Sequence, residues 1–237
     1  MHPYIGAMTR DKQLAASDSV DAFLEKLKSV PPAGAAGRGR LIFGMDATMS
    51  RQPAWDRALS IQADMFNETA RIGGLDVQLV YFRGIRECRA SKWVSNPEAL
   101  SRLMTGIACE GGYTQIGKLL GHIAKQAGAA RVSAAVFVGD AMEESIEEIT
   151  LRAGEIGLLG VPVFVFQDGN DPTAEAAFRQ IARLTRGAYC RLGAGSAAEL
   201  RALLSAVAVY ASGGMKALSD HAAAKGGAAA KLIGQMR

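Results

Sequence analysis

Apolar and polar positions follow two alternating patterns along most of this chain. Short apolar runs, typical of strands buried on both faces of a sheet, alternate with longer segments in which apolar residues recur at helical spacing. The predicted strands are residues 41–44, 76–82, 132–139, 161–166 and 188–192, with a shorter strand pairing near residues 92–94. The predicted helices are residues 53–71, 95–105, 114–127, 142–159, 173–186 and 196–211.

This alternation predicts an α/β fold with a doubly wound, mostly parallel six-stranded sheet, helices on both faces and one short antiparallel edge strand. The domain is expected to span residues 40–212. An N-terminal extension, residues 1–39, precedes it and contains a short helix at residues 18–29 and a Pro/Gly-rich linker. A basic Ala/Gly/Lys-rich tail, residues 213–237, follows the domain and is expected to be mobile.

The distribution of charge changes the meaning of the chain's basicity. The formal charge of +4 and the pI near 9.0 suggest an anionic partner. Residues 41–212, however, carry 17 basic and 18 acidic side chains, a net charge of −1, whereas the two ends carry +2 and +3. Since a nucleic-acid-binding domain usually has a basic stripe on its folded body, the sequence argues against nucleic acid. The ends remain as docking arms for an acidic partner.

Cysteine usage and hydropathy predict the compartment. The three cysteines, Cys88, Cys109 and Cys190, lie far apart without metal-binding spacing, as reduced and mostly buried thiols do. The N-terminus has no apolar signal region, and no stretch approaches about 18 consecutive apolar residues. We therefore expect a cytoplasmic protein that does not interact with a membrane.

Oxygen-bearing side chains gather in three loops that such a fold brings to one edge of the sheet. Asp46, Thr48 and Ser50 follow the first strand, Thr114 opens the helix after a Gly-Gly turn, and Asp140 follows the central strand. Ligands of these sheets bind beyond the carboxyl ends of the strands. An all-oxygen set suits a hard cation, Mg²⁺ above all, with Mn²⁺ or Ca²⁺ as alternatives. Spacing allows the two hydroxyls after the first strand to point the same way.

This constellation resembles the von Willebrand factor A (VWA) domain and its metal-ion-dependent adhesion site, in the form of a stand-alone bacterial cytoplasmic protein. The family pattern is D-x-S-x-S after the first strand, a Thr before the third helix and an Asp after the fourth strand. Here it stands as DATMS at residues 46–50, followed by Thr114 and Asp140. Thr48 replaces a Ser and keeps the hydroxyl, and Met49 stands where the family often has Gly. The resemblance covers residues 40–211.

The resemblance implies a metal site and a function. Thr48, Ser50 and Thr114 would contact the ion directly, and Asp46 and Asp140 would act through waters. An Asp or Glu of a partner protein would take the open coordination position. This is binding without turnover, so the resemblance implies a divalent-cation-dependent protein–protein interaction module, a scaffold or adaptor in an intracellular complex, and no enzyme.

Two alternatives remain open. A Mg²⁺-dependent phosphohydrolase of the haloacid dehalogenase class also places an Asp after the first strand, but its general acid stands two residues later. That position is Thr48, which cannot act as a general acid near neutral pH. The other alternative is a metal-free structural module with a VWA-like fold.

Other conspicuous side chains have simpler interpretations. The acidic cluster after Asp140 is either a contact surface or a solvated helix N-terminus, and the second is preferred; its members are Glu143, Glu144, Glu147 and Glu148. Four arginines either attract an acidic partner or are ordinary surface residues, and the second is again preferred; they are Arg51, Arg83, Arg86 and Arg89. Trp55 is expected to pack in the core, and His122 to be a structural histidine.

Overall fold

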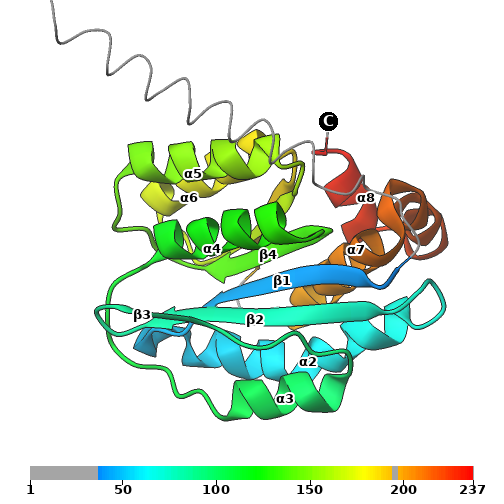
Figure 1. The fold of residues 1–237 in the computed structure, drawn as a ribbon, viewed down its shortest axis with the longest axis horizontal. Coiled ribbons are helices and arrows are strands. Elements are labelled where there is room, and N and C mark those ends of the chain that lie inside the picture. The colour runs from blue at the N-terminus through cyan, green and yellow to red at the C-terminus, as the bar shows by residue number, and fades with distance from the viewer. Residues whose placement is uncertain (1–36, 194–196, 237) are drawn as a thin grey trace, which may run out of the picture.

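The computed structural model describes residues 37–193 and 197–236, which form a six-stranded sheet with helices on both faces (Figure 1). The strand order is β3-β2-β1-β4-β5-β6, and neighbouring strands are parallel except for β3, which runs antiparallel to β2. The strands are β1 (Gly39–Asp46), β2 (Leu75–Arg83), β3 (Glu87–Ala90), β4 (Ala134–Gly139), β5 (Val163–Asp168) and β6 (Ala188–Leu192). The predicted fold class is therefore confirmed.

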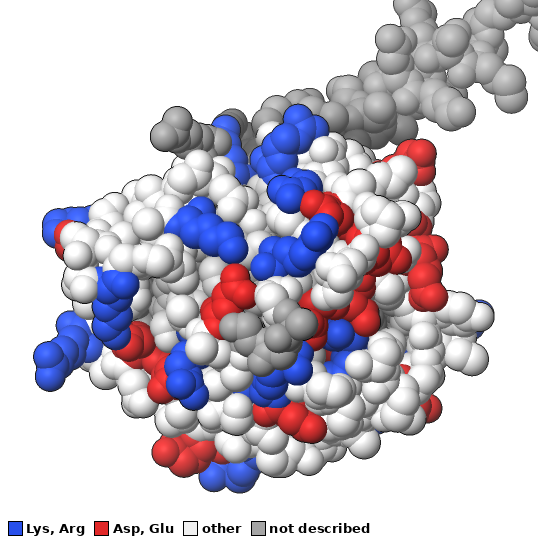
Figure 2. Space-filling model, turned by 180° about the vertical axis from the view of Figure 1, so that it is seen from behind, with Lys and Arg blue, Asp and Glu red and all other residues white. Residues whose placement is uncertain are grey.

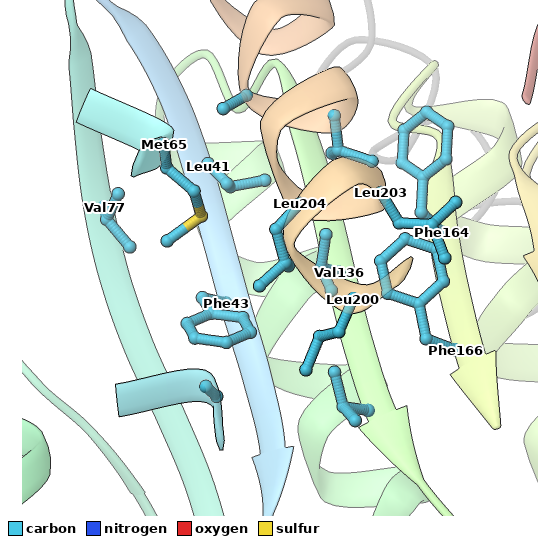
Figure 3. Close-up of a cluster of buried hydrophobic side chains, with 14 of the residues drawn as sticks. Leu41, Phe43, Met65, Val77, Val136, Phe164, Phe166, Leu200, Leu203 and Leu204 are labelled. Carbon is cyan, nitrogen blue, oxygen red and sulfur yellow. The ribbon is translucent and has the colours of Figure 1, made fainter. Parts of the chain in front are cut away.

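Two separate apolar cores lie on the two faces of the sheet. One face is covered by α2 (Gln52–Thr69), α3 (Pro97–Thr105), α7 (Ala197–Lys225) and α8 (Ala228–Ile233), and the other by α4 (Ile116–Ala129), α5 (Ile146–Leu158) and α6 (Pro172–Leu184). Successive residues of a strand point to opposite faces. Leu41 and Phe43 therefore pack in the first core, where Figure 3 shows them with Leu204 of α7, and Ile42 packs in the second. Cover on both faces explains the unbroken apolar runs.

The edge strand differs from the prediction in position. It comprises residues Glu87–Ala90, whereas Val94, in the predicted segment, makes only an isolated bridge with Val77. The four residues of β3 are half-buried or exposed. Because an edge strand of this kind has no apolar run, hydropathy did not locate it.

The C-terminal residues belong to the fold, contrary to the expected mobile tail. After a kink at Gly214, helix α7 continues to Lys225 and α8 follows. Leu218, Ala229 and Leu232 are buried in the first core. Alanine has the highest helix propensity of any residue, so this segment forms helices with only a few large apolar side chains to mark it in the sequence. The predicted short helix at residues 18–29 lies outside the described residues.

The lysines of the C-terminal segment have acidic partners within the chain. Lys216 lies 2.9 Å from Asp220, Lys225 lies 2.5 Å from Glu68, and Lys231 lies 3.4 Å from Glu199. All three pairs are partly solvated, so each contributes little stability. Within residues 213–236, the lysines are thus paired with acidic side chains and do not form the free basic arm expected from the charge distribution.

Helix α7 is long and apolar enough, by length and composition alone, to cross a membrane, and it is the one such helix among the described residues. Half of its most apolar window is buried inside the protein. Leu200, Leu203 and Leu204 pack on the sheet (Figure 3), and the kink at Gly214 interrupts the helix. These contacts are those of a core helix.

His122 on α4 provides a pH-dependent probe of the second face. It is half-buried, and its Nε2 lies 2.9 Å from Oε1 of Gln78, as expected for a structural histidine. Burial lowers the pKa of His122 below its ordinary value of 6.5, because the charged ring is disfavoured. The unfolded chain therefore binds this proton first as the pH falls, so His122 should reduce stability progressively below pH 6.5 and have no such effect above it.

An NMR titration of the His122 ring, assigned by its absence in His122→Gln, measures this directly. We expect a midpoint below 6.5. In urea unfolding, the wild type should lose stability relative to His122→Gln between pH 7.5 and pH 5.5. A midpoint at or above 6.5 would contradict the predicted effect of burial.

Candidate functional site at the carboxyl edge of the sheet

The ends of β1, β4 and β5 bring three carboxylates to one edge of the sheet. Met45 pairs with Val138, so Asp46 ends β1 at the level of the last residue of β4. Gly139 pairs with Gln167, and the same register places Asp140 beside Asp168. Asp168 was not among the predicted site residues. It follows an apolar strand in the same way as Asp140, so the rule that selected Asp140 would also have selected it.

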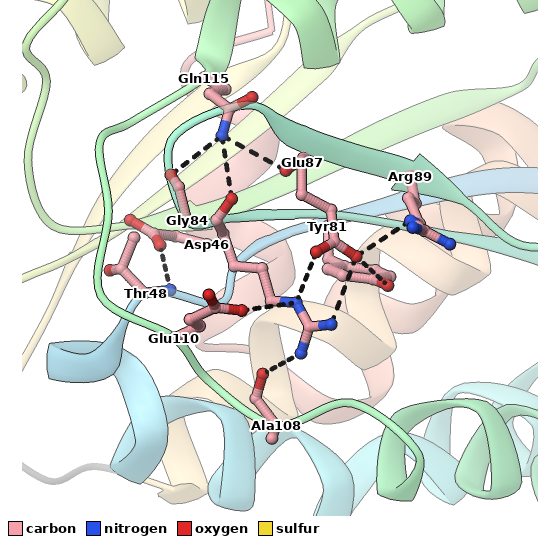
Figure 4. A network of polar contacts seen from close by, with 10 residues as sticks. Asp46, Thr48, Tyr81, Gly84, Glu87, Arg89, Ala108, Glu110 and Gln115 are labelled. Atoms are coloured by element: carbon pink, nitrogen blue, oxygen red, sulfur yellow. Dashed lines mark hydrogen bonds and ion pairs between the residues drawn. The ribbon is translucent and has the colours of Figure 1, made fainter.

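Asp46 is buried at the centre of this edge. Its side chain accepts a hydrogen bond from the backbone N–H of Thr48, with 2.7 Å between the nitrogen and Oδ1 (Figure 4). Burial raises the pKa of Asp46 from 3.8 to about 6, the hydrogen bonds of Thr48 oppose this shift, and nearby Asp140 adds to it. Asp46 and Asp140 are thus close enough to interact electrostatically, as the metal-site prediction requires.

A cation of the chain itself lies between the carboxylates. Arg51, interpreted from the sequence as a surface residue, is only 5% exposed. Its Nη1 lies 3.3 Å from Oδ2 of Asp140, and its Nη2 lies 2.8 Å from Oδ2 of Asp168. Arg57, on the first turns of α2, also binds Asp168 at 2.5 Å. The two arginines neutralise carboxylates that the strand register forces together.

The two hydroxyls after β1 lie in different environments. Thr48 is buried, and Ser50, predicted to point the same way, is exposed. The reason is a short 3-10 helix, η1 (Met49–Arg51), which a hydrogen bond from the Arg51 N–H to the Thr48 carbonyl closes at 2.9 Å. Residues three apart eclipse each other in a 3-10 helix. Arg51 therefore follows Thr48 inward, and Met49 and Ser50 are left outside.

Thr114 is held by the acidic loop that follows β4. Its hydroxyl donates to Oε2 of Glu144 at 2.6 Å and accepts from the backbone N–H of Glu143 at 3.0 Å. Glu143 in turn accepts from the Thr114 N–H, and Glu144 accepts from the Gly117 N–H, both at 2.9 Å. These two acids therefore cap the N-terminus of α4, where negative charge is favourable. The sequence placed them at the start of their own helix, which begins only at Ile146.

The loops at this edge are fastened to one another. The Glu110 N–H donates to the Ala47 carbonyl at 3.0 Å, and the Tyr113 N–H donates to the Gly84 carbonyl at 3.2 Å. Buried Gln115 donates from Nε2 to the Arg83 carbonyl at 3.1 Å and also reaches the carbonyls of the β2–β3 turn (Figure 4). The edge is therefore a preorganised surface built from several loops.

The donors can be compared with what a divalent cation needs. Mg²⁺ binds oxygens at about 2.0–2.1 Å in near-octahedral geometry, usually through one or two carboxylates. Here Asp140 is already paired with a guanidinium, which cannot lose its proton, and Ser50 is exposed. The hydroxyl of Thr114 has one donor and one acceptor partner within the chain. In this arrangement the residues do not fit a divalent ion.

The thiols do not add chemistry to this edge. Cys109 and Cys190 are buried and Cys88 is half-buried, and all three are free. Burial raises the pKa of each thiol, which disfavours the reactive thiolate. The interpretation as mostly buried thiols is confirmed.

No protein-family model matches the chain, and no curated protein is detectably similar to it. Solved structures with a VWA domain are similar in fold. The von Willebrand factor type A protein from Catenulispora acidiphila matches with a TM-score of 0.58 and 14% identity, over 71% of this chain and 42% of that one. The ArnB paralog VWA2 from Sulfolobus acidocaldarius matches with a TM-score of 0.51 and 12% identity, over 74% and 47%.

The SpRpn10 VWA domain matches with a TM-score of 0.53 and 11% identity, over 65% of this chain and 88% of that domain. The chain thus spans less than half of the length of the first two proteins. Identities this low establish the fold alone. The chain has a VWA-like α/β fold, as its sequence resemblance implied.

Proposed function

We propose that this chain is a protein-interaction module, without enzymatic turnover, whose partner binds at the carboxyl edge of the sheet. The observation that carries the proposal is a group of exposed residues on three loops of that edge, which we name the edge patch: Met49, Ile85, Arg86 and Tyr113. Met49, Ile85 and Tyr113 are 63%, 72% and 61% exposed. Large apolar side chains that remain exposed on preorganised loops are typical of binding sites.

The chemistry of the edge patch indicates what the partner brings. Tyr113 and Ile85 lie on adjoining loops, because the Tyr113 N–H donates to the carbonyl of Gly84. Tyrosine and arginine are the residue types enriched at interface hot spots. Arg86 is exposed and has no ion pair with any residue that the structure describes. A partner that places an apolar side chain against Tyr113 and Ile85, and an Asp or Glu against Arg86, complements this surface.

The surface charge supports a protein partner over nucleic acid. On the face seen in Figure 2, the basic side chains of the described residues are interspersed with acidic ones and do not form a stripe. Arg83 and Arg89 both pair with Glu87, each at 3.0 Å. A phosphate backbone requires several accessible cations along one groove. We therefore keep nucleic acid and membranes outside the proposal, as the sequence also suggested.

A bridging metal ion and the phosphohydrolase alternative place different demands on the site. A Mg²⁺, Mn²⁺ or Ca²⁺ ion that bridges to a partner's Asp or Glu stays a prediction from the sequence, and it requires Arg51 to leave Asp140. The phosphohydrolase alternative is not favoured, since Asp46, its nucleophile, is 1% exposed and Thr48 cannot supply the acid. A cytoplasmic location likewise remains part of the proposal.

Capture of the partner by matched variants tests the proposal. The tagged chain and its variants are incubated with lysate of the source organism, and bound proteins are quantified by mass spectrometry. The double variant Ile85→Asp/Tyr113→Asp should lose the partner at least about tenfold, as expected when hot-spot residues worth over 1.4 kcal/mol are removed. The control Leu151→Asp/Leu158→Asp changes two α5 side chains that are 64% and 66% exposed, and should retain it.

A partner retained equally by both double variants would overturn the proposal. A parallel capture in EDTA distinguishes a partner that binds through a divalent cation from one that binds without a metal. Loss of the partner in EDTA would support a bridging divalent cation, and retention would support a face that binds without one. No specific partner for the wild type under either condition would favour the metal-free structural module.

A further inference from the structure

We propose that Arg51 is a built-in cation that takes the place of the divalent ion at this edge, so that the face is assembled without a metal. The inference follows from where η1 directs the side chain. The turn closed by the Arg51 N–H and the Thr48 carbonyl aligns residue 51 with residue 48, toward the sheet. A divalent ion in a site of this pattern would also lie over Thr48 and Asp140. The ion and the guanidinium of Arg51 would therefore occupy the same position.

The guanidinium performs the structural task of such an ion. It binds carboxylates from two different strand ends, Asp140 after β4 and Asp168 at the end of β5. One positive centre thus joins the ends of two adjacent strands. Because the side chain is 6% exposed, its charge is little screened by solvent.

The same contacts exclude a second cation. An ion bound to Oδ2 of Asp140 would lie beside Nη1 of Arg51, which is 3.3 Å from that oxygen. Arginine cannot become neutral, so the two positive charges would repel each other without relief. Nε of Arg51 is buried and has no acceptor among the described residues. An N–H donor without a partner attracts an oxygen atom and repels a metal ion, which strengthens the exclusion.

Removal of the guanidinium should therefore create a metal site. Without Arg51, Asp140 would have no partner among the described residues and Asp46 no neighbouring guanidinium, whereas Asp168 would keep Arg57. The carboxylates of Asp46 and Asp140, with the hydroxyl of Thr48, are oxygen donors that suit Mg²⁺, Mn²⁺ or Ca²⁺. Calorimetric titration and thermal unfolding of the full-length chain, stripped with EDTA, measure this for Mg²⁺, Mn²⁺ and Ca²⁺ separately. The wild type should show no saturable binding and no shift in Tm at up to about 10 mM metal.

Arg51→Ala, and Arg51→Met, which keeps an apolar stem, should gain saturable binding. At about 100 times the dissociation constant, the metal should raise their Tm by roughly 5–10 °C. Arg51→Ala/Asp140→Asn should lose most of this gain, because a carboxylate ligand is gone. A variant that folds only with metal present supports the inference in the same way.

Saturable metal binding by the wild type that Asp140→Asn abolishes would overturn the inference, as would the absence of any gain in both Arg51 variants. If neither variant folds under either condition, the wild-type titration decides alone. The functional meaning of the inference about Arg51 rests on the interaction role proposed above. The titration uses the isolated chain, however, so it can fail while partner capture succeeds, and the reverse.

Discussion

Replacing Arg51 by alanine is expected to lower the free energy of unfolding by about 3–5 kcal/mol, the usual cost of removing one partner from a buried ion pair. Asp140 and Asp168 lie side by side in the strand register, and Arg51 contacts both. Without it, Asp140 has no hydrogen-bond or ion-pair partner among the described residues, and Asp168 keeps only Arg57. The loss is measured by urea unfolding in a metal-free buffer, as a shift of the midpoint at constant slope.

Two other arginines serve as controls for this variant. Arg152→Ala removes an exposed partner of Glu155 on α5 and should change stability by no more than about 0.5 kcal/mol. Arg57→Ala leaves Arg51 in place on Asp168 and should cost less than Arg51→Ala. If Arg51→Ala were as stable as Arg152→Ala, the guanidinium would not be a structural part of this edge.

The sheet was predictable because five of its six strands are covered by helices. Strand β6, for example, was expected at residues 188–192 and is observed as Ala188–Leu192. Local pattern failed where burial is incomplete or is achieved by small residues. Strand β3 is half-exposed. Helix α8 buries Ala229 and Leu232, although it lies in an Ala/Gly/Lys-rich segment whose composition is typical of a mobile tail.

The location of the site could be predicted from the sequence, but the arrangement of its side chains could be predicted only in part. Asp46 and Asp140 do meet at the carboxyl edge, because parallel strands end together and polar residues follow them. The inward direction of Arg51 depends on η1, a three-residue 3-10 helix that no periodicity marks. The hydrogen bonds of Thr114 with Glu143 and Glu144 join residues 29 and 30 positions apart, which only the tertiary fold brings together.

Two adjacent glycines test whether the edge loops are as closely fastened as their hydrogen bonds indicate. A Cβ at Gly112 would lie 2.0 Å from the carbonyl oxygen of Gly84 and 2.2 Å from its carbonyl carbon, whereas a Cβ at Gly111 would meet nothing within 4 Å. Neither glycine has a positive φ, so the difference between them is one of space and not of backbone conformation. Because backbone atoms cannot move aside as a flexible side chain can, Gly112→Ala must separate the two loops.

Gly112→Ala should therefore lower the free energy of unfolding by about 2–3 kcal/mol, the upper part of the usual range for overpacking. Gly111→Ala should be neutral or raise it by up to about 1 kcal/mol, since alanine restricts the unfolded chain. Urea unfolding of both variants gives the comparison, and equal stability of the two would contradict the contact. The separation also moves Tyr113 relative to Ile85, since the Tyr113 N–H is bonded to Gly84. If the edge patch is the binding face, Gly112→Ala should weaken partner capture while the chain is still folded, and Gly111→Ala should leave it unchanged.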